Sequence, residues 1–157
     1  MIIVLFGQPH SGKSTIANEI MKRTSTFTNI DGDKLRDIFS NKDFSKEGRI
    51  KNLNRASDIA HYLDCTGKNV ILSLVYPYRE AREYLNSLSK RVCWVYLKYE
   101  GERGREKFHV TDFEEPSESE SLILDTSKED LSSCIDKIST YVDEKIISRS
   151  SWQKFHI

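Results

Sequence analysis

Gly7-Gln8-Pro9-His10-Ser11-Gly12-Lys13-Ser14 is the stretch that decides the fold, because it fits the phosphate-binding pattern G-x-x-x-x-G-K-[ST]. Residues 1–6 before it form an uninterrupted apolar run, which is typical of a parallel strand buried on both faces. Residues 14–23 after it place apolar side chains on one face of a helix. The motif therefore lies between a strand and a helix, the context that a phosphate loop requires.

Each residue type in this loop has a chemical task. Gly7 and Gly12 let the backbone turn tightly and aim N–H groups at phosphate oxygens. Lys13 adds a full positive charge to the partial charge of the helix N-terminus, and the Ser14 hydroxyl can ligate Mg²⁺. We therefore predict an ATP site built from the whole loop and the adjoining Thr15, with Lys13 also a catalytic residue. The alternative is a Gly-rich turn that binds no ligand.

Bulk properties limit the class of protein. A length of 157 residues predicts a single domain over residues 1–157. The 24 basic residues equal the 24 acidic ones in number, so no global field favours nucleic acid or a membrane as a partner. Cys65, Cys93 and Cys134 lack metal-ligand spacing and are typical of thiols in a reducing cytosol. The apolar start is too short for a signal peptide or a membrane span, so we expect a soluble, cytoplasmic protein. The oligomeric state stays open, with a homodimer as one option.

Strand-like and helix-like segments alternate along the chain. Apolar runs predict strands at 1–6, 27–30, 69–75, 91–97 and 122–124, and periodic segments predict helices at 14–23, 34–40, 45–66, 80–88 and 127–147. Ser45 is the expected N-cap and Gly67 the expected C′ residue of the long third helix, and Thr126 or Ser127 is expected to cap the last one. The pattern predicts an α/β fold: a three-layer α/β/α sandwich with a parallel five-stranded sheet, of the P-loop kinase type.

Two segments do not fit this alternation. Residues 98–120 are charged and long for a connection, so we interpret them as a functional lid. The tail, residues 148–157, is expected at the surface and poorly ordered.

Carboxylates follow the second predicted strand, at the edge of the sheet where ligands bind. Phosphoryl transfer needs a group that orients and deprotonates the attacking hydroxyl. We assign that role, and part of the magnesium shell, to Asp33, because it faces the phosphate loop across the cleft. Asp31 either joins the magnesium shell or caps the next helix. For each carboxylate, a purely structural role in the turn is the alternative.

Basic residues gather on the next helix. Arg49, Asn52 and Arg55 are spaced by about one turn, and Phe44 stands just before them in a polar stretch. A ring beside several arginines suits a nucleotide-like acceptor, stacked on its base and held by its phosphate. The alternatives are a solvated helix end for the arginines and a hydrophobic staple for Phe44.

Taken together, these segments resemble the adenylylsulfate kinase (APS kinase) family, in a compact branch with a shortened lid. The matching runs, in order, are the phosphate loop, Asp31-Gly32-Asp33-Lys34-Leu35-Arg36, Phe44-Ser45 with Arg49, Asn52 and Arg55, Tyr76-Pro77-Tyr78-Arg79, and Leu124-Asp125-Thr126. The resemblance covers residues 2 to about 147 and is far more specific than the loop alone. It implies transfer of the ATP γ-phosphate to the 3′-hydroxyl of adenylylsulfate, with ATP and Mg²⁺ required.

The resemblance also implies roles for individual residues. It assigns Asp33 to the acceptor hydroxyl and the metal ion, and Thr126 to the border of the ATP adenine. It assigns to adenylylsulfate the residues Arg36, Phe44, Arg49, Asn52, Arg55, Lys107 and Phe108.

Three departures from the family pattern affect the acceptor. Tyr76 replaces the family Ser before P-Y-R, so that role does not carry over, and Tyr76 is assigned to the acceptor site by its place after the third strand. Lys34 replaces the usual Asn. In the altered lid run, Arg103 or Arg105 replaces the lost lid cation over the phosphates, and the sequence does not choose between them.

Alternatives to adenylylsulfate kinase activity therefore stay open. A kinase of the same build could act on another hydroxyl, of a sugar, a nucleoside or a modified base. The neutral net charge makes a nucleic-acid acceptor the weakest of these. A nucleotide-binding module without catalysis is the alternative from another class.

Overall fold

The computed structural model describes residues 1–101, 104 and 108–153, with the side chains of that part as far as residue 146. A helix or a strand lies in each segment where the sequence predicts one. In chain order they are β1 (Ile2–Phe6), α1 (Lys13–Arg23), β2 (Phe27–Asp31), α2 (Gly32–Ile38), α3 (Lys46–Cys65), β3 (Asn69–Ser73), α4 (Arg79–Leu88), β4 (Val92–Lys98), β5 (Leu122–Asp125) and α5 (Leu131–Gln153).

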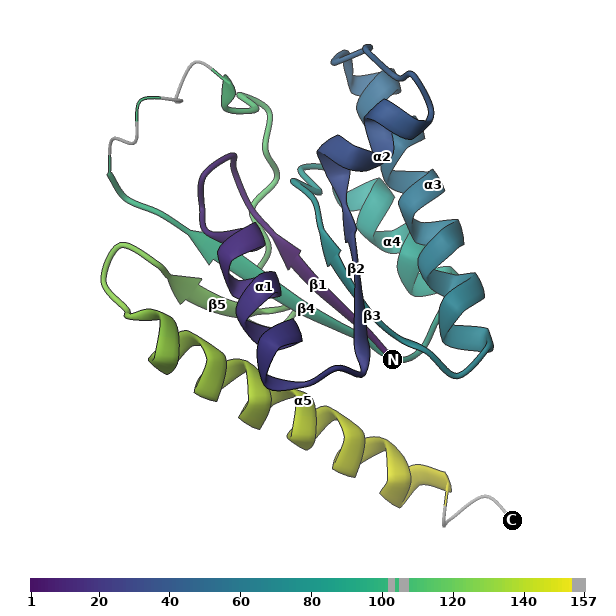
Figure 1. Ribbon diagram of the computed structural model, residues 1–157, viewed down its shortest axis with the longest axis vertical. Coiled ribbons are helices and arrows are strands. Elements are labelled where there is room, and N and C mark those ends of the chain that lie inside the picture. The colour runs from purple at the N-terminus through teal and green to yellow at the C-terminus, as the bar shows by residue number, and fades with distance from the viewer. Residues whose placement is uncertain (102–103, 105–107, 154–157) are drawn as a thin grey trace.

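The strands form one five-stranded parallel sheet in the order β2-β3-β1-β4-β5 (Figure 1). The central strand is β1, whose Ile2 is paired with Val70 of β3 on one side and Val92 of β4 on the other. Because every strand runs the same way, all carboxyl ends meet at one edge of the sheet. The phosphate loop leaves that edge from the middle, between the ends of β3 and β4. The predicted α/β fold with a parallel sheet is confirmed.

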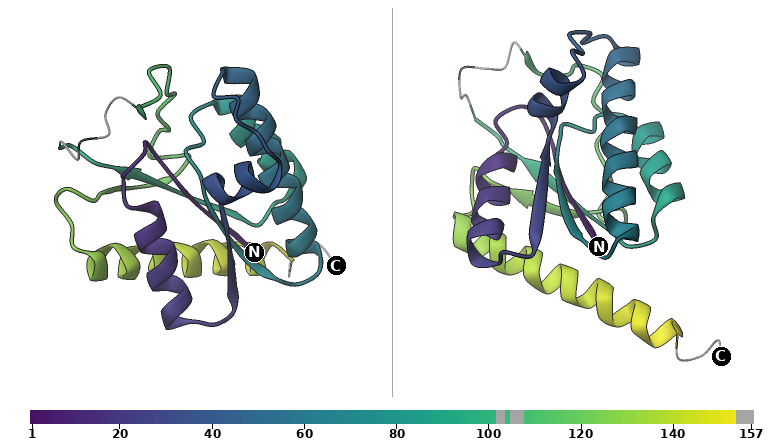
Figure 2. Two further views of the ribbon diagram at one scale, coloured as in Figure 1. Left: turned by 45° about the horizontal axis from the view of Figure 1, so that its top comes forward. Right: turned by 45° about the vertical axis from the view of Figure 1, so that its right-hand side comes forward.

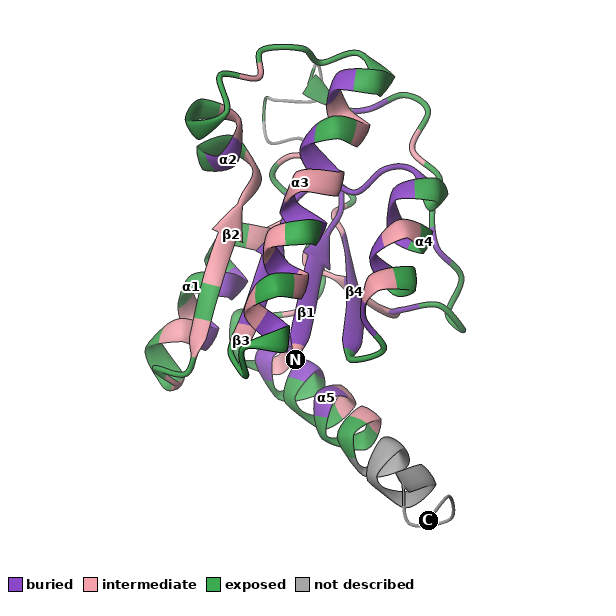
Figure 3. Ribbon diagram, turned by 90° about the vertical axis from the view of Figure 1, so that its right-hand side faces the viewer, coloured by how far each residue is buried: buried purple, intermediate pink, exposed green. Residues whose placement is uncertain are grey.

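Helices cover both faces of the sheet and give the three predicted layers (Figure 2). Val4 lies in the core beneath α3 and α4, together with Leu53. Leu5, its neighbour in the strand, points the other way into the core beneath α1 and α5, with Ile16 and Ile138. As a result β1 is buried along its whole length, whereas the outer faces of the helices are exposed (Figure 3).

The ends of α3 follow the sequence signals. The Ser45 hydroxyl accepts a hydrogen bond from the Gly48 amide at 3.2 Å, which satisfies a free donor of the first turn. Gly67 has a φ of +81°, the left-handed conformation expected just beyond a helix. Both predictions are confirmed.

The last helix differs from the prediction at both ends. It begins at Leu131, because the Asp130 carboxylate accepts from the Ser133 amide at 2.8 Å and acts as the cap in place of Thr126 or Ser127. The helix continues through Gln153 rather than ending near residue 147, and residues 154–157 lie outside the described part. Cys65, Cys93 and Cys134 are not in disulfides. Within the described ranges, no helix combines the length and the apolar character needed to cross a bilayer.

Candidate active site

Three residues of the phosphate loop have a positive φ. Gly7 has a φ of +148°, and a Cβ there would lie 2.3 Å from the Leu97 backbone oxygen, so only glycine fits. Gly12 has a φ of +98° and forms the N-cap of α1. His10 has a φ of +66°, in the left-handed region that favours glycine. This geometry opens the start of α1 toward a phosphate group.

Lys13 rests on the carbonyl oxygens of its own loop. Its ammonium donates to the oxygen of Gly7 at 3.0 Å and to that of Gln8 at 2.7 Å. Burial lowers the pKa of Lys13 to about 8, while the negative charges of Asp33 and Asp31 act in the opposite direction. The ammonium can therefore exchange two neutral acceptors for charged phosphate oxygens.

The two carboxylates after β2 have different roles. Asp31 caps α2, because its side chain accepts from the amides of Asp33 and Lys34, both at 3.1 Å. The geometry therefore supports the capping role of Asp31. Asp33 is exposed, and no described residue donates a hydrogen bond to its carboxylate. Burial lowers the pKa values of Lys13 and Arg36, and the negative charge of Asp33 opposes that lowering in both.

Phe44 lies close to two arginines. The guanidinium of Arg36 lies 4.3 Å and that of Arg49 5.6 Å from the ring centroid. Backbone oxygens hold both side chains: Arg36 donates to Asp43 at 2.8 Å and Arg49 to Phe44 at 2.9 Å. Partial burial and the charge of Arg49 both lower the pKa of Arg36. Two cations held this close beside an exposed ring favour an aromatic anion as their ligand.

Asn52 and Arg55 extend this surface along α3. Asn52 is 4% exposed, and its side-chain oxygen has no hydrogen-bond partner among the described residues. A ligand donor would satisfy that oxygen. The Arg55 guanidinium lies over a different ring, that of Phe39, at 4.4 Å. Phe44, Arg36 and Arg49 are thus brought together, whereas Arg55 belongs to a neighbouring stack.

The assignment of Tyr76 to the acceptor site is wrong. Its side chain is completely buried, its hydroxyl lies 2.9 Å from the Ser57 hydroxyl, and its ring meets Trp94 edge to face at 5.3 Å. Burial raises the pKa of Tyr76, which keeps the phenol neutral. Tyr76 has a φ of +44°, and its side chain is part of the core beneath α3 and α4 rather than of the acceptor site.

Of the predicted lid, the structure describes residues 98–101, 104 and 108–120. Arg103, Arg105 and Lys107 lie outside the described residues. Phe108 is described and is 54% exposed.

Residues 110–115, which we call the strap, lie within the predicted lid, residues 98–120, and the sequence assigned none of them an individual role. The strap lies against the phosphate loop and the turn before α4. The side chain of Arg82 is buried beneath it and donates to the Tyr76 and Glu114 carbonyl oxygens, both at 2.9 Å. The one available signal is an apolar Val110 and Phe113 in a charged run.

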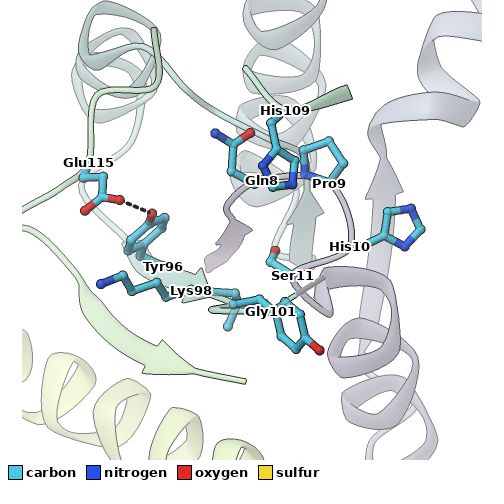
Figure 4. Close-up of a pocket in the computed structure, with 11 residues that line it drawn as sticks. Gln8, Pro9, His10, Ser11, Tyr96, Lys98, Gly101, His109 and Glu115 are labelled. Carbon is cyan, nitrogen blue, oxygen red and sulfur yellow. Dashed lines mark hydrogen bonds between the residues drawn. The ribbon is translucent and has the colours of Figure 1, made fainter. Parts of the chain in front are cut away.

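A cavity of about 170 Å³ lies between the phosphate loop and the end of β4. Figure 4 shows Pro9 and His109 on one side of it and Tyr96 with Lys98 on another. The Tyr96 hydroxyl donates to Glu115 of the strap at 3.2 Å. On the other side of the loop, the Thr126 hydroxyl donates to the Ser11 oxygen at 2.8 Å, so predicted ATP-site residues do meet at this edge.

Comparisons with known proteins agree with this arrangement. A model of the family described as adenylylsulphate kinase matches residues 1–107. The probable adenylyl-sulfate kinase of Bacillus subtilis (strain 168) is 29% identical over 170 residues, which cover 92% of this chain and 86% of that protein. The probable adenylyl-sulfate kinase of Aeropyrum pernix is 31% identical over 152 residues, which cover 80% of this chain and 83% of that protein.

A solved structure shares the fold. It is the Mycobacterium tuberculosis APS kinase in complex with AMPPNP and APS, with a TM-score of 0.76, 18% identity, and coverage of 90% of this chain and 96% of that one. From the family match and the relatives, together with the site that the sheet edge assembles, we conclude that this chain belongs to the adenylylsulphate kinase family.

Proposed function

We propose that this protein transfers the γ-phosphate of ATP to the 3′-hydroxyl of adenylylsulfate. The observation that carries the proposal is the pairing of Arg36 and Arg49 around the exposed Phe44 ring, beside a carboxylate whose charge acts on Lys13. This pairing suits an acceptor that is both aromatic and anionic. The products are 3′-phosphoadenylylsulfate and ADP.

Bond by bond, the reaction needs little covalent chemistry from the protein. The 3′-oxygen of the acceptor forms a bond to the γ-phosphorus, and the bond from that phosphorus to the β–γ bridging oxygen breaks. The proton of the attacking hydroxyl goes to the Asp33 carboxylate. Lys13 leaves the oxygens of Gly7 and Gln8 and neutralises charge on the β- and γ-phosphates.

The residues of this edge also fit Mg²⁺. Ser14 and Asp33 offer the hydroxyl and carboxylate oxygens that this hard cation prefers. Among the described residues, no cluster of three or more His, Cys, Asp or Glu side chains could hold a metal by itself. A site completed by nucleotide phosphates and water is the usual arrangement for Mg²⁺. When bound, the ion supplies positive charge to the phosphates.

An assay with ATP, Mg²⁺ and adenylylsulfate tests the proposal, with detection of the 3′-phosphorylated product. We expect turnover in the wild type and a loss of about 10²–10⁴-fold in kcat for Asp33→Asn, with ATP affinity largely kept. Asp37→Asn is the matched control, because it removes an exposed carboxylate one turn further along α2. ADP release with a sugar or nucleoside but not with adenylylsulfate would overturn the acceptor while leaving phosphoryl transfer in place.

A further inference from the structure

The strap is bonded at several points along its length. The Glu114 amide donates to the Pro77 oxygen at 2.8 Å, and the Glu114 carboxylate accepts from the backbone amide of Arg79. The ring of Phe113 packs on that of Tyr96, with 5.7 Å between centroids. These contacts fix the strap on the turn before α4 and on the end of β4.

At its other end the strap is bonded to the phosphate loop through one side chain. The Gln8 amide group donates to the Val110 oxygen at 2.8 Å, and the Gln8 side-chain oxygen accepts from the Val110 amide at 2.9 Å. Val110 is 5% exposed, so its backbone groups depend on protein partners. The pair has the reciprocal form of two bonded residues in an antiparallel sheet.

The chemistry of this pair requires a carboxamide. A side chain here must donate to one backbone group and accept from the other, and both groups are neutral. Leucine or methionine of similar size leaves both Val110 groups without a partner. A carboxylate can accept but cannot donate, and it places a charged oxygen beside the Val110 carbonyl.

Gln8 is also part of the ATP-binding machinery through its backbone. Its carbonyl oxygen accepts from the Lys13 ammonium at 2.7 Å, within the loop that must present N–H groups to phosphates. One residue therefore bonds the strap with its side chain and Lys13 with its main chain. Fixing the side chain limits how far this part of the loop can turn.

We propose that Gln8 is a positioning residue that uses the strap to hold the phosphate loop in its ATP-binding conformation. The inference rests on the proposed kinase function, because it assumes that the loop binds ATP. Loss of the side-chain amide weakens phosphate binding through disorder of the loop rather than through a lost ligand contact. Because Gln8 belongs to the nucleotide site and also bonds the strap, nucleotide binding in turn changes the stability of the strap.

The first test replaces Gln8 and measures kinetics. We expect Gln8→Leu to lower kcat/KM for ATP by about tenfold, the equivalent of one or two neutral hydrogen bonds, at every pH. Gln8→Glu should show the same loss near pH 8 but recover relative to wild type as the pH falls toward about 5. A protonated carboxyl group donates and accepts as the amide does, and this bonding raises its pKa. A merely structural role does not produce this pH-dependent recovery.

A second variant and a second measurement distinguish failure of this inference from failure of the proposed function. Tyr96→Phe removes the strap's bond from Tyr96 to Glu115 and leaves Gln8 untouched, so it should show no pH-dependent recovery. Hydrogen exchange at Val110, measured with a non-hydrolysable ATP analogue and no acceptor, should slow in the wild type and not in Gln8→Leu. Equal kinetics in wild type and Gln8→Leu, or exchange that slows in both, would overturn the inference. A wild type that binds the analogue but does not turn over adenylylsulfate would instead overturn the proposed acceptor.

Discussion

The Thr126 hydroxyl donates a hydrogen bond to the backbone oxygen of Ser11 at 2.8 Å and thereby fastens the phosphate loop to the segment after β5. Ser11 is buried, so its carbonyl oxygen depends on this donor. We expect Thr126→Val, which keeps the shape and removes the hydroxyl, to lower the free energy of unfolding by about 1–3 kcal/mol and to raise KM for ATP. Thr126→Ser keeps the donor and should stay close to wild type. Denaturant unfolding and ATP kinetics check this, and a valine variant equal to wild type in both would contradict it.

The buried position of Lys13 predicts an alkaline limit of activity. Burial lowers its pKa from 10.5 to about 8, against the charges of Asp33 and Asp31. Only the protonated form attracts phosphate, so kcat/KM for ATP should fall about tenfold per pH unit above pH 8. Bound ATP brings negative charge next to the ammonium and raises its pKa. At saturating ATP, kcat should therefore begin to fall only at a higher pH.

Lys13→Arg is the control for this limit, since a guanidinium stays protonated throughout the accessible range. The variant is expected to be slow, because a guanidinium does not reproduce the shape of the ammonium. Its residual activity should lack the fall above pH 8. A fall that persists in Lys13→Arg would assign the titration to another group.

The exposed Phe44 ring should govern affinity for the acceptor. Phe44 is 59% exposed although two guanidiniums flank it, an arrangement suited to stacking on a purine. Phe44→Leu should raise KM for adenylylsulfate about tenfold, the order expected for one base stacked on one ring, and leave KM for ATP unchanged. Phe39→Leu is the matched control, because Phe39 is also exposed and lies under an arginine, Arg55. Equal effects of the two substitutions would argue against a specific stacking site at Phe44.

Asp64 stabilises the opposite end of the sheet. Burial raises its pKa, but hydrogen bonds from the Met1 amino group, Arg91 and Ser89 outweigh burial and leave the pKa below its ordinary value of 3.8. The stabilisation is therefore complete above pH 3.8 and is lost as the pH falls through the lowered pKa of the folded state. Asp64→Asn should cost about 1–3 kcal/mol near neutral pH, and the difference from wild type should shrink in acid.

Asp58→Asn provides the comparison for Asp64, since Asp58 is an exposed carboxylate on the same helix, α3. We expect its cost to stay below about 1 kcal/mol. Chemical denaturation of the three proteins at several pH values measures both effects. A difference for Asp64→Asn that stays constant down to strongly acid pH would contradict the assigned cause.

The fold was predictable because its signals are local. The apolar run before Gly7, the loop motif and the caps at Ser45 and Gly67 each act through neighbouring residues, and the structure has all of them. Tyr76 was misplaced because its sequence position gives the strand end correctly but not the direction of the side chain. That direction depends on a φ of +44° and on packing against Trp94, and neither leaves a sequence pattern.

The residues that hold the candidate site in place were less predictable than the motif residues of the site. Gln8 and Val110 are separated by 102 positions, so no periodicity or motif connects them. The stack of Arg36 on Phe44 brings together the end of one helix and the loop before the next, and sequence spacing indicated only that both lie near the acceptor. Residues that act through a motif can be found from sequence, whereas residues that hold the motif in place need the tertiary structure.

At Gly48, helix propensity and packing predict opposite effects of an alanine substitution on stability. Alanine is favoured over glycine inside a helix by about 1 kcal/mol, so Gly48→Ala in α3 should stabilise the protein if only the helix matters. A Cβ at Gly48 would, however, lie 2.4 Å from the Asp43 backbone oxygen, which accepts from Arg36 at 2.8 Å. Because that oxygen cannot move without displacing Phe44, we expect a net loss of about 1–3 kcal/mol and a higher KM for adenylylsulfate. Gly67→Ala at the other end of α3 should cost about 1 kcal/mol through its positive φ and leave that KM unchanged. Denaturant unfolding and acceptor kinetics distinguish the two, and a Gly48→Ala protein more stable than wild type would show that the loop before α3 is not packed against this residue.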